Sequence, residues 1–295
     1  MGWFDENAVV ILNGIATGLL LFMMAVGLTV IFGLMNVLNL AHGTFYLAGS
    51  YLAYRIIGGS AATWTGFLAA IAVAITVGIV LGYALMVMTA PLARRGHLDQ
   101  ALLTLGTALV LGQVLQIVFG IQDYSVASPP GLTGSVQVLS SGYPTYRLFV
   151  IGIGAIIAAA VWYLVERTPL GAIVRATVAD PDMVSAIGID LKRVKLAVFV
   201  GASILAVLGG VLAGPVRGAS PGADIEILVL ALVVIVIGGP GSIVGTLVGS
   251  LLIGLVQNVG VLFFPQVAAY LVFGVMVLVI ALRPQGLFTR AKVVR

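Results

Sequence analysis

The chain has 295 residues, of which 61% are hydrophobic and only 8% are charged, and its formal net charge is +4. Ordinary soluble domains carry about 25% charged residues, so this composition excludes a soluble enzyme, a nucleic-acid-binding protein and a disordered protein. Glycine occurs 38 times, and small residues let helices pack closely in a membrane. The composition therefore predicts an all-α polytopic integral membrane protein.

Apolar runs of about the length that crosses a bilayer, roughly 20 residues, recur along the whole chain. The second run contains many polar residues and glycines, and the seventh is short. We therefore expect about eight to ten transmembrane helices, some of them broken or re-entrant, in a single transmembrane domain over residues 1–295. The runs lie at about residues 8–32, 36–57, 62–90, 99–119, 145–165, 195–216, 224–238, 242–262 and 265–282.

The basic residues are sorted between the breaks that separate these runs. Eleven of the fourteen lie in the breaks near 91–98 and 166–195 and in the C-terminal tail. Loops rich in Lys and Arg stay on the cytoplasmic side of a membrane. This distribution predicts a periplasmic N-terminus and a cytoplasmic C-terminus, and an odd number of crossings agrees with it.

The densest polar stretch within apolar sequence is residues 33–44, which read GLMNVLNLAHGT. Non-helical backbone at membrane depth is tolerated only where it is buried in protein or lines a cavity. The stretch is thus either a broken helix beside a translocation path or a tight corner between helices whose Asn side chains cap helix ends. Its polar residues are Asn36, Asn39, His42 and Thr44.

Other uncharged polar residues share single helix faces. Asn13 precedes Thr17 by four residues in the first run, and Gln113 precedes Gln116 by three in the fourth. Such groups either line a path for a small polar solute or form hydrogen bonds between helices. The candidate pathway residues are Asn13, Asn36, Asn39, His42, Thr44, Gln113 and Gln116.

Residues 166–195 form the one extended hydrophilic stretch of the sequence. Thr-Pro at 168–169 and Asp-Pro at 180–181 are signals for the start of a helix. A short helix with a small apolar face then follows and ends at a glycine. This pattern predicts either a contact with a groove on another protein or a solvated connector on the membrane surface. The face comprises Met183, Ala186 and Ile187, and the helix ends at Gly188.

A second helix break lies at residues 238–242, which read Gly-Gly-Pro-Gly-Ser. The glycines and the proline end one helix, and Ser242 is suited to cap the next. Glycines then recur every four residues, which indicates a close helix–helix contact. The residues assigned to helix breaks and packing are Gly43, Gly238, Gly239, Pro240, Gly241, Gly245 and Gly249.

Motifs for catalysis and nucleotide binding are absent from the sequence. It contains no GxxxxGK[ST], HExxH or GxSxG motif and no cysteine, so we expect neither an enzyme nor a metal site. The acidic residues all fall in breaks or at span ends, whereas ion-driven carriers usually keep an ionisable group at membrane depth. The sequence therefore favours a passive channel or a permease driven by another subunit.

Four motifs in order along the chain resemble those of the branched-chain amino acid ABC transporter permeases. Residues 38–43 (LNLAHG), followed by Gly-Ser-Tyr at 49–51, are similar to the early signature of the shorter of the two related permease subunits. Residues 170–189 resemble the cytoplasmic coupling loop of the family. Residues 238–245 and the terminal RPQGL at 283–287 are similar to its later signatures.

This resemblance implies an importer of the bacterial inner membrane that moves branched-chain amino acids or a related small polar solute from periplasm to cytoplasm. The implied partners are a second permease subunit (a related chain or a second copy), two ATPase subunits and a periplasmic substrate-binding protein. ATP and Mg would bind in the ATPase subunits, with no cofactor in this chain. The residues implied for ATPase coupling are Arg175, Asp180, Asp182, Met183, Ala186, Ile187 and Gly188.

The alternative, from another functional class, is a stand-alone channel for a neutral solute such as urea or a short amide. A channel has no need of the 30-residue basic loop at 166–195. A third hypothesis is a membrane scaffold subunit that has no solute pathway of its own.

Overall fold

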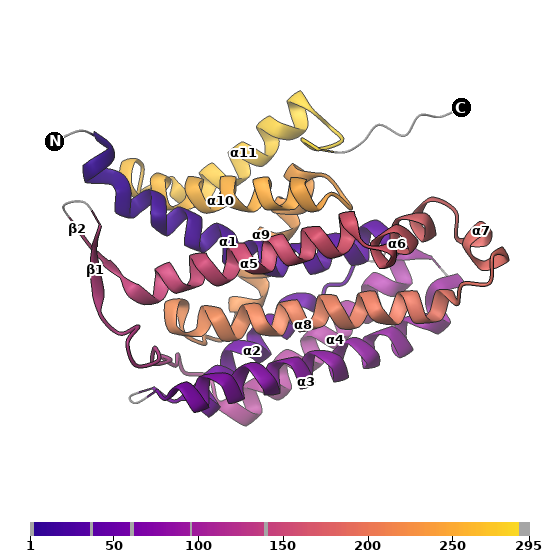
Figure 1. Ribbon diagram of the computed structural model, residues 1–295, viewed down its shortest axis with the longest axis horizontal. Helices are drawn as coiled ribbons and strands as arrows, with labels where there is room; N and C mark the ends of the chain where they lie inside the picture. The colour runs from indigo at the N-terminus through magenta and orange to yellow at the C-terminus, as the bar shows by residue number, and fades with distance from the viewer. Residues whose placement is uncertain (1–2, 36–37, 60–61, 95, 139–140, 289–295) are drawn as a thin grey trace.

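The computed structural model describes residues 3–35, 38–59, 62–94, 96–138 and 141–288 and shows an elongated helical bundle (Figure 1). Most of the longer helices run along the long axis of the molecule. The elements are α1 (Trp3–Met35), α2 (His42–Ile57), α3 (Trp64–Thr89), η1 (Ala90–Arg94), α4 (His97–Phe119), β1 (Ser135–Val138), β2 (Ser141–Pro144), α5 (Thr145–Arg167), α6 (Pro169–Ala179), α7 (Pro181–Ala186), α8 (Leu191–Arg217), α9 (Ala223–Gly238), α10 (Ile243–Phe263) and α11 (Ala268–Leu282).

Each predicted apolar run contains a helix, which confirms an all-α polytopic membrane protein. Among the described residues, six helices (α1, α3, α4, α5, α8 and α10) are long and apolar enough to cross a membrane. Helices α2, α9 and α11 have 16, 16 and 15 residues. The prediction for the second run was wrong at its start, because residues 38–41 are not helical and α2 begins only at His42.

Helix α1 forms the centre of the bundle and α4 lies at its periphery. The apolar window of α1 is 78% buried, whereas that of α4 is 6% buried. Phe22, Met23 and Met24 of α1 are completely covered by the surrounding helices. A helix that is apolar on all sides is expected in such a central position, while the exposed apolar face of α4 suits lipid or another chain.

Glycines bring the helix backbones into direct contact. A Cβ added at Gly18 of α1 would lie 2.8 Å from the Cα of Leu251 in α10. A Cβ at Gly82 of α3 would lie 2.7 Å from the Cα of Val200 in α8. Real Cβ atoms essentially never approach so closely, so these positions require glycine for the observed spacing of the helices.

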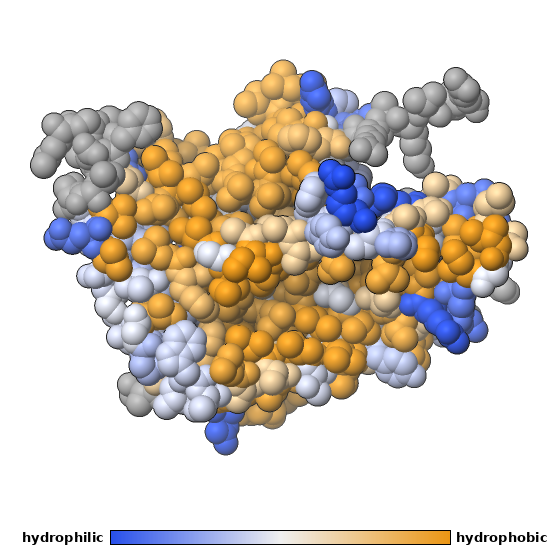
Figure 2. Space-filling view, viewed as in Figure 1, coloured by the Kyte–Doolittle hydropathy of each residue, from blue (hydrophilic) through white to orange (hydrophobic). Residues whose placement is uncertain are grey.

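The two ends of the bundle differ in character. Strands β1 and β2 form an antiparallel hairpin that lies near the start of α1, whereas α6 and α7 lie at the opposite end (Figure 1). The hairpin falls within the non-helical segment 120–144, and its four-residue strands are too short to leave a period-2 signal. Figure 2 shows hydrophobic residues over the middle of one face and hydrophilic residues mostly towards its edges.

Candidate functional site

Helix α2 begins inside the bundle and not at its end. Thr104 of α4 holds the preceding turn, since its buried hydroxyl accepts from the Leu40 amide (3.1 Å) and donates to the Leu38 carbonyl (3.0 Å). The His42 Nε2 donates to the carbonyl of Met24 at 3.1 Å. Met24 lies eleven residues before the end of α1, so α2 starts roughly 16 Å in from that end at 1.5 Å per residue.

Asn39 and His42 are fully buried, and their polar atoms form hydrogen bonds within the chain itself. The Asn39 Oδ1 accepts from the amide of Ala41 at 3.1 Å, and its Nδ2 lies 3.5 Å from the His42 Nδ1. With Nε2 protonated toward Met24, the His42 Nδ1 is free to accept. Asn39 and His42 therefore hold the corner that starts α2, while Asn36 lies outside the described residues.

Helix α9 begins directly against the start of α2, and we call this contact the α2–α9 junction (Gly43, Thr44 and Asp224). A Cβ at Gly43 would lie 2.3 Å from the Asp224 carbonyl oxygen, so the two backbones touch. The buried Thr44 hydroxyl donates to the Asp224 carboxylate at 3.2 Å and lies 3.5 Å from the carbonyl of Ala108. Ala108 is the middle residue of α4.

The carboxylate of Asp224 thus lies midway along a membrane-length helix, although Asp224 is in the first turn of its own helix. Asp224 does lie at a helix end, as the sequence predicted for the acidic residues. The sequence did not predict that this helix end lies beside the middle of α4. The first turn of α2 lies against Asp224, and the positive end of a helix dipole stabilises a nearby carboxylate. The half-buried Asp224 is therefore an ionisable group level with the middle of a membrane-length helix.

Helix α4 covers the junction from one side. A Cβ at Gly112 would lie 3.6 Å from the Asp224 carboxylate. Tyr51, seven residues after Thr44 and on the same face of α2, stacks on Phe119 of α4 with ring centroids 4.8 Å apart. The Tyr51 hydroxyl is buried and has no hydrogen-bond partner among the described residues. A buried hydroxyl without a partner is costly, so the Tyr51 hydroxyl is available to bond a group that enters this seam.

The remaining predicted pathway residues lie on α4 and α1. Gln113 is exposed and Gln116 half-buried on α4. The Asn13 Oδ1 accepts from Arg147 of α5, which joins two helices near the hairpin end. The junction itself was missed from sequence, because its two partners Thr44 and Asp224 are 180 residues apart.

The break at residues 238–242 is a close-packed corner. A Cβ at Gly245 would lie 2.1 Å from the Gly238 carbonyl oxygen, and Ser242 caps α10 by accepting from the Gly245 amide at 3.0 Å. A Cβ at Gly33 of α1 would lie 2.5 Å from the Cα of Gly241. Pro240, Gly239 (φ 93°) and Gly249 complete the corner, where α1, α9 and α10 meet.

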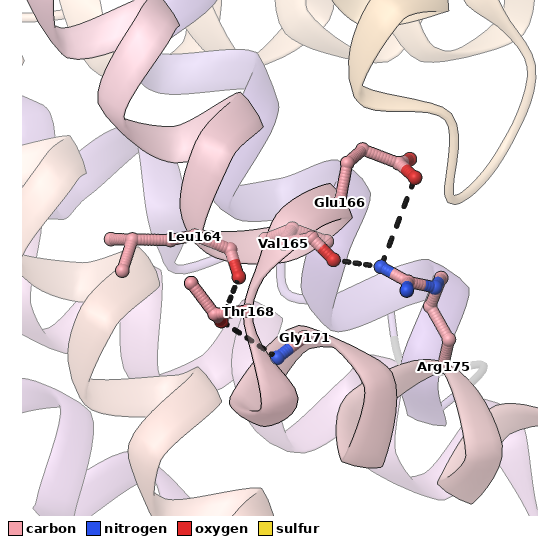
Figure 3. A network of polar contacts seen from close by, with 6 residues as sticks. All are labelled: Leu164, Val165, Glu166, Thr168, Gly171 and Arg175. Carbon is pink, nitrogen blue, oxygen red and sulfur yellow. Dashed lines mark hydrogen bonds and ion pairs between the residues drawn. The ribbon is translucent and has the colours of Figure 1, made fainter.

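Residues 168–190, here called the α6–α7 arm, project at the end of the bundle opposite the hairpin (Figure 1). Thr168 caps α6 by accepting from the Gly171 amide, and Arg175 donates to the Val165 carbonyl and pairs with Glu166 at 3.8 Å (Figure 3). A Cβ at Gly171 would lie 2.0 Å from the Val165 carbonyl oxygen. These contacts fold α6 tightly onto the end of α5.

The apolar face of α7 is uncovered. Asp180 caps α7 by accepting from the Met183 amide at 2.9 Å, and Gly188 (φ 87°) ends the turn that follows. Met183 and Ile187, one turn apart, are 61% and 65% exposed, while Val184 is buried. Asp182 and Ala186 are also exposed. Two large apolar side chains displayed on an otherwise hydrophilic loop suit a contact with another chain.

Comparisons with known proteins agree over nearly the whole chain. The family described as branched-chain amino acid transport system / permease component matches residues 10–281. The high-affinity branched-chain amino acid transport system permease protein BraD of Pseudomonas aeruginosa is 28% identical, with 96% of each chain covered. The corresponding protein LivH of Escherichia coli K12 is 25% identical over 95% of each chain.

A relative named for a different solute also matches. The ribose import permease protein RbsC of Escherichia coli K12 is 28% identical over 80% of this chain and 72% of its own length. No solved structure matches at a significant level.

Proposed function

This chain belongs to the branched-chain amino acid transport system permease component family, and we propose that it is the transmembrane permease subunit of an ATP-binding-cassette importer. The proposed cargo is a branched-chain amino acid or a related small polar solute, moved from periplasm to cytoplasm. The names of the relatives BraD and LivH support the amino acid class, and RbsC widens it to other polar solutes. The multi-pass protein would lie in the bacterial inner membrane.

The α6–α7 arm is the structural feature that most directly supports an ATP-driven mechanism. It presents Met183 and Ile187 to the outside at one end of the bundle, beside the basic start of α8 (Lys192, Arg193 and Lys195). Basic segments favour the cytoplasmic side, where ATPase subunits reside. The proposed arrangement places two ATPase subunits on the arms of two permease subunits and a substrate-binding protein at the hairpin end.

The contacts of the arm provide a route for coupling. Helix α6 is fixed to α5 through Arg175 and Gly171, and α7 leads into α8 at the cap Asp190. Helix α8 packs backbone to backbone on α2, since a Cβ at Gly49 would lie 2.0 Å from the Val207 carbonyl oxygen. A push on α7 would therefore move α8 and, through α2, shift the α2–α9 junction. Such a shift would switch the access of the solute path.

The test of this proposal is ATP-dependent uptake by the transporter reconstituted with its ATPase subunits and binding protein. Met183→Asp and Ile187→Asp place charge on the apolar face and should abolish uptake and ATPase association without reducing membrane insertion. Ser185→Asp is the matched control, because it lies on another side of the same short helix, and it should retain uptake. Normal uptake by both apolar-face variants would contradict the proposal.

At the junction, the Asp224 carboxylate is the group that would receive the ammonium of an amino acid. Thr44 orients the carboxylate by donating to it at 3.2 Å, and the Tyr51 hydroxyl is left to bond the solute. Gln113 and Gln116 of α4 are proposed to line the rim. The alternative of a stand-alone channel gives the arm no role, and ATP-independent flux through the chain alone would favour that alternative.

A further inference from the structure

An apolar groove runs along the side of the bundle between α1, α5 and α10. It has a volume of about 540 Å³ and is lined by Ile15 and Leu19 from α1, Ala155 and Trp162 from α5, and Leu247 and Leu251 from α10, among others that are likewise apolar. The alanines of α5 leave the space that larger side chains would fill. The groove lies outside the α2–α9 junction and the α6–α7 arm.

The groove lies along the middle of α5 and is about as long as half of the bilayer hydrocarbon core. On α5 it extends from Ile151 to Trp162, which is roughly 16 Å at 1.5 Å per residue. Half of the bilayer hydrocarbon core is about 15 Å. Because a transmembrane helix would need contacts over the full core of about 30 Å, a groove of this length fits a single acyl chain better than a helix of another protein.

A cation lies at one end of this groove. The Arg167 guanidinium stands over the Trp162 ring at 5.3 Å from its centroid, and no carboxylate of the described residues lies within ion-pair distance of it. The neighbouring Arg175 is already paired with Glu166. Trp and Arg are typical of the membrane–water boundary, so the apolar groove ends beside a positive charge that no carboxylate of the described residues pairs with.

We propose that the α1–α5–α10 groove binds one acyl chain of an anionic phospholipid whose headgroup phosphate pairs with Arg167. The apolar lining supplies the site for the chain, and the single guanidinium supplies the preference for an anionic headgroup. Arg forms paired hydrogen bonds with phosphate oxygens, which a zwitterionic headgroup satisfies less well because its ammonium group opposes the guanidinium. The bound lipid would brace α5 immediately before the arm.

The experiment is native mass spectrometry of the intact transporter titrated with phosphatidylglycerol or phosphatidylethanolamine. Wild type should retain phosphatidylglycerol preferentially, and Arg167→Gln should lower its binding roughly fivefold, the effect of one basic residue at a lipid surface. Arg193→Gln, a basic residue away from the groove, should change nothing. Equal binding of the two lipids by wild type, or an unchanged preference in Arg167→Gln, would overturn the proposal.

A second pair of variants tests the groove itself. Ala159→Phe should fill the groove and lower the binding of both lipids, whereas Ile156→Phe on another face of α5 should not. Thermal unfolding of each variant in detergent verifies that the fold is retained. If a photoreactive residue at position 159 crosslinks to another protein subunit in place of lipid, a protein occupies the groove and the proposal fails.

Discussion

Gly210→Ala should separate α8 from α2. A Cβ at Gly210 would lie 2.0 Å from the Tyr46 carbonyl oxygen and 2.9 Å from the Ser50 amide nitrogen. Both obstacles are backbone atoms, so no side chain can rotate away. The helices would have to move apart by about 1.4 Å before the carbonyl reaches the 3.4 Å at which ordinary contact begins.

The cost follows from two effects. Overpacking a close helix contact costs about 1–3 kcal/mol. The Ser50 hydroxyl donates to the Gly210 carbonyl at 3.2 Å, and stretching that bond adds about 0.5–1.5 kcal/mol. The two effects together would lower the free energy of unfolding by about 1.5–4.5 kcal/mol, and the better helix propensity of alanine would offset up to about 1 kcal/mol of this loss.

The assay is reversible unfolding of the purified chain in mixed micelles with increasing SDS, followed by circular dichroism. Gly201→Ala in the same helix is the matched control, because an added Cβ there meets nothing within 4 Å. The control should be stabilised by up to about 1 kcal/mol through helix propensity. Equal free energies of unfolding for the two variants would refute the close approach of α8 and α2.

Three further predictions concern single polar contacts. The Thr246 hydroxyl donates to the Ser242 carbonyl and accepts from the Thr29 hydroxyl at 2.9 Å. Thr246→Val leaves the buried Thr29 hydroxyl unpaired and should lower the free energy of unfolding by about 1–3 kcal/mol in the same assay, whereas Thr29→Val should lower it by about 0.5–1.5 kcal/mol. Equal losses for the two variants would contradict this order. Asp180→Ala should weaken α7 by about 1 kcal/mol, seen as faster amide hydrogen exchange confined to residues 181–186, and unchanged exchange would rule out the cap. Asp224→Asn should reduce uptake of an amino acid roughly tenfold, equivalent to about 1.4 kcal/mol, and undiminished uptake would exclude an ammonium contact.

Local signals in the sequence predicted much of this structure. Thr168, Asp180 and Ser242 were assigned to helix starts, and each accepts a hydrogen bond from an amide three residues on. Capping depends only on neighbouring residues, and helix formation in lipid follows from the need to satisfy every backbone group internally. Both can therefore be inferred without knowledge of the tertiary structure.

The start of α2 shows where local signals fail. The polar residues in the run at 36–57 predicted either a broken helix or a corner between helices, and the turn before His42 is held by Thr104 and by the Met24 carbonyl. These partners lie on other helices, and the hydrogen bonds that they offer outweigh continuation of the helix. The sequence left the choice between a broken helix and a corner open for the same reason.

The repeated apolar runs of about 20 residues by themselves determined that this protein is a polytopic helical bundle, because a helix satisfies every backbone group of such a run within the run itself. The depth of Asp224 was decided only by tertiary structure. From sequence it stands at the end of a short helix, yet the backbone contact with Gly43 draws that end to the middle of α4. Depth depends on which distant helices pack together, and that packing is a property of the whole bundle.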